Sequence, residues 1–150
     1  MYSNVIGRII LALVLAAALS GCANLGGMGS TASLFEQIGG SKAVTQLAGN
    51  FLQSAAGDSR LTSLLGQADI STLTPAVANQ FCSELGGGCK APLSAQQIAE
   101  GAKKVNPTQA SALSDALSGA LDKSGANSAV QSSVTQSIGS KLGGIMGGLL

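Results

Sequence analysis

SLFEQIGGSKAV, residues 33–44, joins the capped start of one helix to a pair of glycines and then to the start of a second helix. Ser33 and Glu36 have the spacing of a capping box, in which the serine hydroxyl accepts an early helix N–H and the glutamate accepts the serine N–H. Gly39-Gly40 ends this short helix, because glycine adopts positive φ without steric cost. Ser41 is then placed to cap the next helix. The stretch therefore predicts two helices joined by a sharp glycine turn.

Apolar residues recur every three or four positions along most of the following chain, which is typical of helices with one buried face. Asp69 or Ser71 is placed to cap a turn, and Pro75 is at a position that the start of a helix tolerates. No segment alternates with period two, so the predicted fold class is all-α. We expect helices over Lys42–Ala56, around Phe81 up to Gly86–Gly88, from Ser94, over Pro107–Ser124, and from Val130 to Leu142.

The first 21 residues have the pattern of a cleaved export signal. A single basic residue, Arg8, precedes the apolar run Ile9–Leu19, which is too short to cross a bilayer as a permanent helix. Leu19-Ser20-Gly21-Cys22 resembles the lipobox of bacterial lipoproteins, in which the cysteine is lipidated and becomes the new N-terminus. We therefore expect residues 1–21 to be a lipoprotein signal peptide and Cys22 to be the lipidation site, with palmitate among the acyl chains that hold the protein to the membrane.

The resemblance to lipoproteins also implies a location. Ala23, rather than an aspartate, follows Cys22, which suggests sorting to the outer membrane with the folded part in the periplasm. Residues 22–32 are small and glycine-rich and have no periodicity, as expected for a lipidated cysteine followed by a flexible tether. The folded domain is expected over residues 33–142, with residues 143–150 as an apolar, glycine-rich tail.

The charge balance excludes several functions. Removal of Arg8 with the signal peptide leaves seven of the eight basic residues, against seven acidic ones. A near-neutral chain with 3% aromatic residues offers neither a basic surface nor a stacking platform, so we expect no nucleic-acid partner.

The acids Glu84, Glu100, Asp115 and Asp122 share no spacing typical of a carboxylate pair or a metal site. We predict no catalytic residues and no metal site.

Several of these features together resemble a group I truncated haemoglobin. They are the double-glycine opening of residues 33–40, Phe51, the turn at residues 58–61, and Phe81 ahead of Leu85-Gly86-Gly87. The resemblance covers most of residues 33–125. It implies a small α-helical sandwich that encloses haem, with a proximal histidine on the helix before Asn106-Pro107.

The residues that hold haem in that family are missing here. The proximal position falls near Glu100, Gly101 and Ala102, and the chain has no histidine. Leu52 stands where the family commonly has its distal tyrosine, and the only tyrosine of the chain lies in the signal peptide. Haem iron is held in proteins by His, Cys, Met or Tyr. The sulfur atoms of Cys82, Cys89, Met28 and Met146 remain, none of them at the proximal position.

Cys82 and Cys89 form an even pair once Cys22 is set aside. Six residues lie between them, three of them glycines, so the end of a helix has enough slack to meet the following loop. Because the periplasm is oxidising, a disulfide is the preferred interpretation, with free buried thiols as the alternative. Closing so small a loop contributes about 2 to 3 kcal/mol in the chain-entropy account. A redox role is less favoured, because the spacing is not Cys-x-x-Cys.

Two classes of function follow from this sequence. The first is a non-enzymatic envelope lipoprotein with a haemless globin-like domain in a structural or interaction role, and no cofactor. The second is a binder of haem, another tetrapyrrole or an apolar ligand through a non-histidine ligand. A closed core with Glu100 in solvent favours the first class, and an apolar pocket with a reachable sulfur favours the second. The tail either covers the domain's own apolar surface, which we expect, or inserts into a partner or membrane.

Overall fold

The computed structural model describes residues 32–150, and the folded unit within them is Ser33–Leu150. The predicted signal peptide, Cys22 and nearly all of the tether lie outside the described residues. The described part is all-α, as predicted. Its elements are α2 (Leu34–Ile38), α3 (Gly40–Ala56), η1 (Ser59–Leu61), α4 (Thr62–Leu65), α5 (Ile70–Glu84), α6 (Ala95–Ala102), α7 (Pro107–Ser124), α8 (Ser128–Ile138), η2 (Gly139–Lys141) and α9 (Leu142–Leu149).

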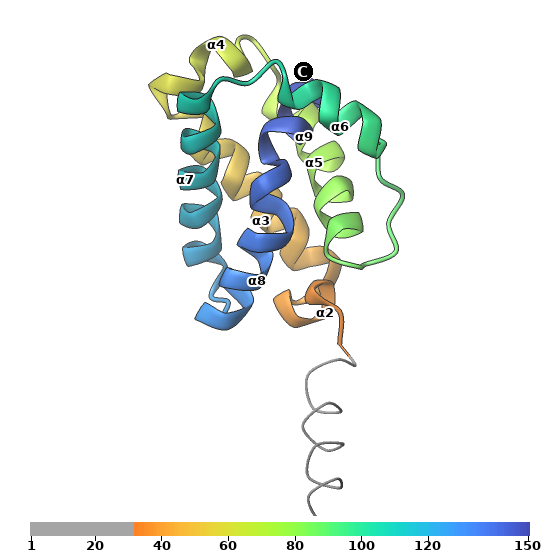
Figure 1. The fold of residues 1–150 in the computed structure, drawn as a ribbon. Coiled ribbons are helices and arrows are strands. Elements are labelled where there is room, and N and C mark those ends of the chain that lie inside the picture. The colour runs from red at the N-terminus through yellow and green to blue at the C-terminus, as the bar shows by residue number, and fades with distance from the viewer. Residues whose placement is uncertain (1–31) are drawn as a thin grey trace, which may run out of the picture. The chain divides into compact units, whose positions relative to one another are not determined.

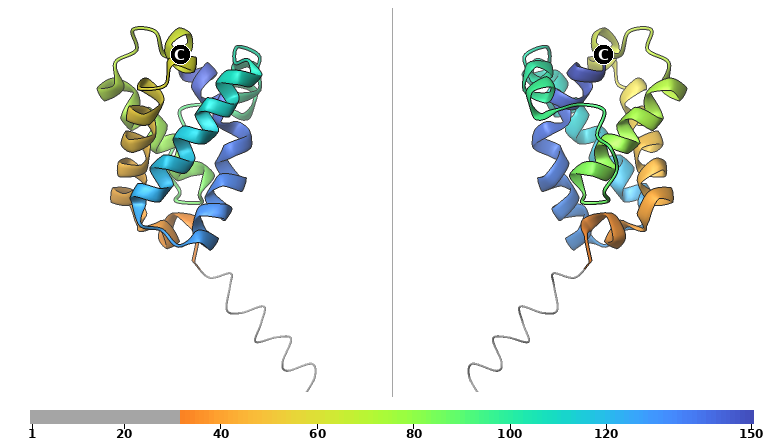
Figure 2. Two further views of the ribbon diagram at one scale, coloured as in Figure 1. Left: turned by 90° about the vertical axis from the view of Figure 1, so that its left-hand side faces the viewer. Right: turned by 90° about the vertical axis from the view of Figure 1, so that its right-hand side faces the viewer.

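The longer helices surround one apolar core (Figure 1). Helix α3 contacts both α5 and α7, and α9 contacts α5, α6 and α7. Figure 2 shows α3 and the α8–α9 segment on opposite sides of the domain, with α7 crossing on one face and α5 on the other. Phe51 of α3 and Phe81 of α5 are fully buried at the centre, with ring centroids 5.6 Å apart. Both phenylalanines are among the residues that carry the resemblance, and their contact joins α3 to α5.

The opening stretch folds largely as its residues predict. The Ser33 hydroxyl accepts the Glu36 N–H at 3.3 Å, and the Glu36 carboxylate accepts the Ser33 N–H at 3.3 Å. Gly39 and Gly40 have φ of 113° and 73°, as the turn requires. The prediction that Ser41 caps the next helix is wrong. Because the turn reverses the chain within the glycine pair, α3 begins at Gly40, and its N-cap is Gly39 without a side-chain hydrogen bond.

The prediction for Pro75 is also wrong. Asp69 is the cap, accepting the Ser71 N–H at 2.8 Å, and a single helix runs from Ile70 to Glu84 with Pro75 in its interior. Proline has no N–H to donate to the carbonyl of Ser71, four residues earlier. Both Ser71 and Pro75 are exposed, so water can satisfy that carbonyl and the helix continues.

The last residues of the chain belong to the core. Residues 143–150, described above as an apolar, glycine-rich tail after the domain, lie in α9 or directly follow it. Ile145 and Met146 are fully buried, and Leu150 is the one exposed large apolar residue of the described part, at 40%. Helix α9 therefore covers the domain's own apolar surface. Within residues 32–150, no helix combines the length and the apolar character needed to span a membrane.

Candidate functional site

The three residues at the predicted proximal position lie on the last turn of α6. Ser94, predicted to open this helix, is its N-cap, and the Ser94 hydroxyl accepts the Gln97 N–H at 3.3 Å in a capping box. Glu100 is exposed, and its carboxylate pairs with the Lys103 ammonium at 2.9 Å in solvent. Ala102 is exposed and Gly101 is buried. Of the three, only the backbone of Gly101 faces the interior.

Gly101 packs directly on the backbone of α9. A Cβ atom built on Gly101 would overlap backbone atoms of Gly144, Gly147 and Gly148. The contact is reciprocal, because a Cβ on Gly147 would overlap the Gly101 carbonyl, and one on Gly144 would overlap the Ile98 carbonyl. Real Cβ atoms do not approach other atoms so closely, so glycine is required on both helices. The side-chain direction that a proximal ligand would use is filled by α9.

The remaining face of α9 fills the core. Ile145 and Met146 have no exposed surface and belong to the same apolar cluster as Phe51 and Phe81. Close packing of this kind is what protein interiors maintain, because empty space loses contact energy. The thioether of Met146 is therefore a packing group in this arrangement.

The other two sulfur atoms of the described residues are bonded to each other. A disulfide joins Cys82, near the end of α5, to Cys89 in the following loop, with the Cα atoms 5.7 Å apart. Cys82 is 3% exposed and Cys89 is half-buried. Neither sulfur is available as a thiolate ligand while the bond is intact.

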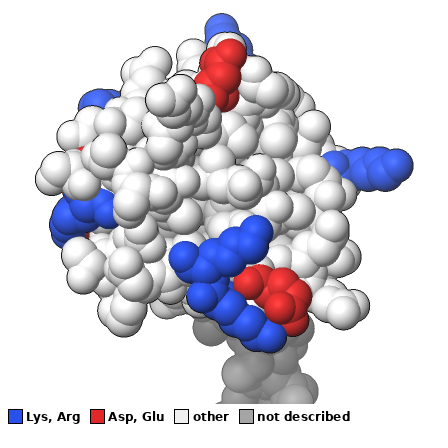
Figure 3. All heavy atoms as spheres, turned by 90° about the horizontal axis from the view of Figure 1, so that it is seen from above, with Lys and Arg blue, Asp and Glu red and all other residues white. Residues whose placement is uncertain are grey.

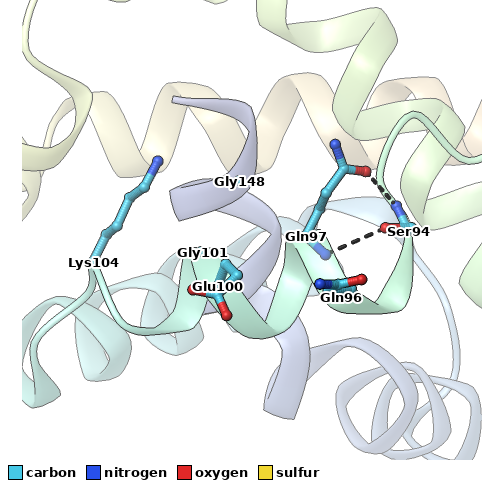
Figure 4. A pocket seen from close by; sticks show the side chains of 7 residues that line it. All are labelled: Ser94, Gln96, Gln97, Glu100, Gly101, Lys104 and Gly148. Carbon is cyan, nitrogen blue, oxygen red and sulfur yellow. Dashed lines mark hydrogen bonds between the residues drawn. The ribbon is translucent and has the colours of Figure 1, made fainter.

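A surface hollow of about 280 Å³ lies beside α6 (Figure 4). Its polar side chains all come from Ser94 and from α6 and the residues just after it, and the capping box of Ser94 and Gln97 is drawn there as dashed lines. No residue with an apolar side chain lines it, and its walls include the stems of the polar side chains and the two glycines. The lining residues are Ser94, Gln96, Gln97, Glu100, Gly101, Lys104 and Gly148.

A second hollow, of about 300 Å³, lies where α5 faces the loop before α6 and the start of α6. An ion pair between Glu84 and Lys141 lies at this hollow and ties α5 to η2. Gln80, 1% exposed, accepts the Leu93 N–H at 3.1 Å and donates to Glu84 at 3.2 Å. Sequence analysis missed this buried amide, because nothing in its position along α5 distinguishes it from a surface glutamine.

On the face of the domain shown in Figure 3, most of the surface is uncharged, and basic side chains lie beside acidic ones near its lower edge. Arg60 bridges two carboxylates, with distances of 2.6 Å to Asp58 and 2.9 Å to Asp115, and so ties η1 to α7. The side-chain hydrogen bond from Arg60 lowers the pKa of Asp58, aided by the Arg60 backbone N–H. A hydrogen bond from Ser71 likewise lowers the pKa of Asp69. These shifts arise from helix caps and an ion pair, and they do not mark a proton-transfer site.

Haem does not fit the residues that the structure describes. Gly101 offers no ligand atom, and α9 fills the direction in which one would point. Met146 is packed in the core, and Cys82 and Cys89 are bonded together. Within residues 32–150, no three His, Cys, Asp or Glu side chains lie together as a metal site would require. Haem iron takes its axial ligand from His, Cys, Met or Tyr, and of these the described residues hold only Cys82, Cys89 and Met146.

Comparison with known proteins bears on the fold alone. A scan against protein-family profiles and a search of curated proteins found no match. Among solved structures, the chain is similar to a tyrosine-to-phenylalanine mutant of the truncated haemoglobin from Tetrahymena pyriformis in its Fe(III) form, with a TM-score of 0.63 and 19% identity. The similarity covers 71% of this chain and 92% of that one. The described domain therefore has a truncated-globin-like fold.

Proposed function

We propose that this chain is an envelope lipoprotein whose truncated-globin-like domain works without haem, as a non-enzymatic structural or interaction module. The backbone contact of Gly101 with α9 carries the proposal. It puts α9 in the direction that the proximal ligand would use, while Glu100 stays in solvent. That arrangement is the one that favours a haemless scaffold over a ligand-binding globin. The disulfide of Cys82 and Cys89 suits an oxidising compartment such as the periplasm.

The haemless part of the proposal is tested by the haem content of the protein made in cells. The lipidated chain is isolated from membranes of bacteria supplied with a haem precursor, and haem is assayed per chain as its pyridine complex. The control is a haem-binding truncated haemoglobin given the same signal peptide and anchor. We expect the control to carry haem and this chain to carry only traces. A near-stoichiometric amount in this chain would overturn the proposal.

The location is tested separately at Cys22. The lipobox resemblance predicts that cells fed labelled palmitate label the wild-type chain and that the label disappears in Cys22→Ser. The wild-type chain is expected in the outer-membrane fraction and the variant in another fraction, since loss of the acyl chains removes the anchor. A wild-type chain that stays unlabelled and leaves the membrane in salt would refute the anchoring.

A further inference from the structure

The disulfide joins two sulfur atoms in unequal environments. Cys82 is 3% exposed, on the buried side of α5. Cys89 is half-buried, in the loop that leads away from α5. A small surface hollow of about 70 Å³ is lined by both cysteines together with residues of α3 and α5. A thiol that approaches from solvent therefore has better access to the sulfur of Cys89.

The loop closed by this bond also holds α2. Gly87 fits between the ring of Phe35 and the sulfur of Cys82, and a Cβ at this position would overlap both. The Gly87 N–H donates to the Cys82 carbonyl at 2.8 Å, which fixes the loop in that place. The Phe35 N–H donates to the Leu85 carbonyl at 3.0 Å, so α2 is bonded to the end of α5 as well.

The far end of the loop is fixed independently. The Leu93 N–H is bonded to the buried amide of Gln80, and the capped start of α6 follows directly. Opening the disulfide therefore removes the covalent brace of residues 86–92 without detaching α6, and leaves the start of this segment held by the hydrogen bonds of Gly86 and Gly87 to the end of α5. Since α2 is the first helix after the predicted tether, the loosened segment is the one that braces the anchored end of the domain.

We propose that Cys89 is a thiol-exchange site and that the intact disulfide stabilises α2, so that its reduction loosens this helix. A small thiolate, such as glutathione, attacks the Cys89 sulfur and forms a mixed disulfide there. The bond between Cys82 and Cys89 breaks, and its electron pair goes to the Cys82 sulfur, which takes up a proton to become a buried thiol. The loop is then held against Phe35 only by the hydrogen bonds of Gly86 and Gly87 to the end of α5, and α2 becomes less protected.

Mapping of the mixed disulfide tests the first part of the proposal, that the attacked sulfur is that of Cys89. The lipidated wild-type chain in detergent is treated with limiting glutathione, quenched in acid with N-ethylmaleimide, and cleaved after Glu84, which separates the two cysteines. We expect glutathione on the Cys89 peptide in about tenfold excess or more, because access to the sulfur decides which atom is attacked. Equal amounts on the two peptides would overturn the assignment.

Two single variants provide a matched control. Cys82→Ser leaves the half-buried thiol of Cys89, and Cys89→Ser leaves the buried thiol of Cys82. In the folded state, the half-buried thiol of Cys89 in Cys82→Ser is expected to react with a maleimide about tenfold faster or more than the buried thiol of Cys82 in Cys89→Ser, since thiol reactivity follows exposure. In denaturant the two rates should agree. Should either variant fail to fold, the wild-type mapping still decides the question.

Hydrogen exchange tests the second part of the proposal, that the disulfide stabilises α2. On reduction of the wild-type chain, the amides of α2 and of residues 86–92 should exchange faster, while those of α7 keep their protection. A matching increase in α7 would mean loss of the fold as a whole, and unchanged exchange in α2 would mean that the disulfide does not hold it. Either outcome would refute the proposal that the disulfide stabilises α2.

Discussion

Gly101 shows how a single residue closes the place where the resemblance puts a haem ligand. It is the buried one of the three proximal candidates, and its lack of a side chain allows the α9 backbone to reach α6. The glycines on α9 have the complementary spacing, with Gly144, Gly147 and Gly148 on the face toward α6. A histidine at position 101 would need α9 to move away.

Gly101→Ala is therefore expected to destabilise the domain. The added methyl group overlaps backbone atoms that cannot rotate away, and overpacking of this kind costs about 1 to 3 kcal/mol. The measurement is the free energy of unfolding in urea. Gly119→Ala is the matched control, since a Cβ there meets nothing within 4 Å. The control should gain about 0.5 to 1 kcal/mol from helix propensity. Equal effects of the two substitutions would contradict the close contact.

Asp58 gives a prediction for acid solutions. Hydrogen bonds from the Arg60 side chain and backbone lower its pKa below the ordinary value of 3.8. A lowered folded-state pKa contributes stability above the unfolded-state value, and this contribution is lost as the pH falls through the folded-state value. Asp58→Asn should therefore be less stable than wild type near neutral pH, and the difference should shrink as the pH falls below that ordinary value.

The control for this pH series is Asp122→Asn. Asp122 is exposed on α7, and the described residues give it neither a hydrogen bond nor an ion pair. Its substitution removes no hydrogen bond or ion pair, so the variant should stay close to wild type in stability. A gap between Asp58→Asn and wild type that does not change with pH would mean that the Asp58 carboxylate gains nothing from Arg60 on folding.

At the scale of elements, the start of α7 is set by a reciprocal cap. Asn106 accepts the Gln109 N–H at 2.9 Å, and Gln109 accepts the Asn106 N–H at 3.0 Å. Gln109 also donates to the Ser63 hydroxyl at 3.0 Å, so the cap fixes α7 to α4. Asn106→Ala should lose about 1 kcal/mol of unfolding free energy. Thr108→Ala, at an exposed position in the same turn, should change it much less. A loss in both variants alike would mean that the reciprocal cap is not what the Asn106 substitution removes.

Helix starts and stops were the most predictable features of this chain. Ser33, Ser94 and Asn106 act through bonds to residues three positions away, so their local sequence specifies the result. Ser41 and Pro75 were mispredicted, because the turn at Gly39-Gly40 makes Gly39 the N-cap of α3, and because α5 begins at Ile70 and continues through Pro75 on an exposed part of the helix. Both depend on surroundings that a sequence pattern does not contain.

The contact between α6 and α9 was not predictable from either segment alone. The residues 142–149, LGGIMGGL, indicate a poor isolated helix because of their glycines, and a lone Gly101 in a helix has several interpretations. Only the fold brings Gly101 opposite Gly144 and Gly147 and turns poor helix formers into a close-packed interface. The available signal was the spacing of glycines at three and four residues on one face of residues 142–149.

On the scale of the whole molecule, α9 completes the core. A chain ending at Lys141 lacks Leu142, Ile145 and Met146, all almost fully buried, and exposes the face of α6 that they and the glycines cover. Losing several core side chains costs more than the stability of a typical small domain. We expect the truncated chain to unfold without a cooperative transition and to bind a hydrophobic dye. Removing Leu150 alone should leave cooperative unfolding intact, and a cooperative chain ending at Lys141 would contradict this role.

The central claim is that the domain folds with the position that the resemblance gives to a haem ligand closed. The most direct test is a titration of haemin into the lipidated chain in detergent, under oxidising and reducing conditions, against detergent alone and with helicity followed by circular dichroism. We predict a cooperatively folded helical protein and no saturable, shifted Soret band. A one-to-one band would contradict the account, and its loss in Met146→Leu or in Cys82→Ser would identify the ligand that replaces histidine.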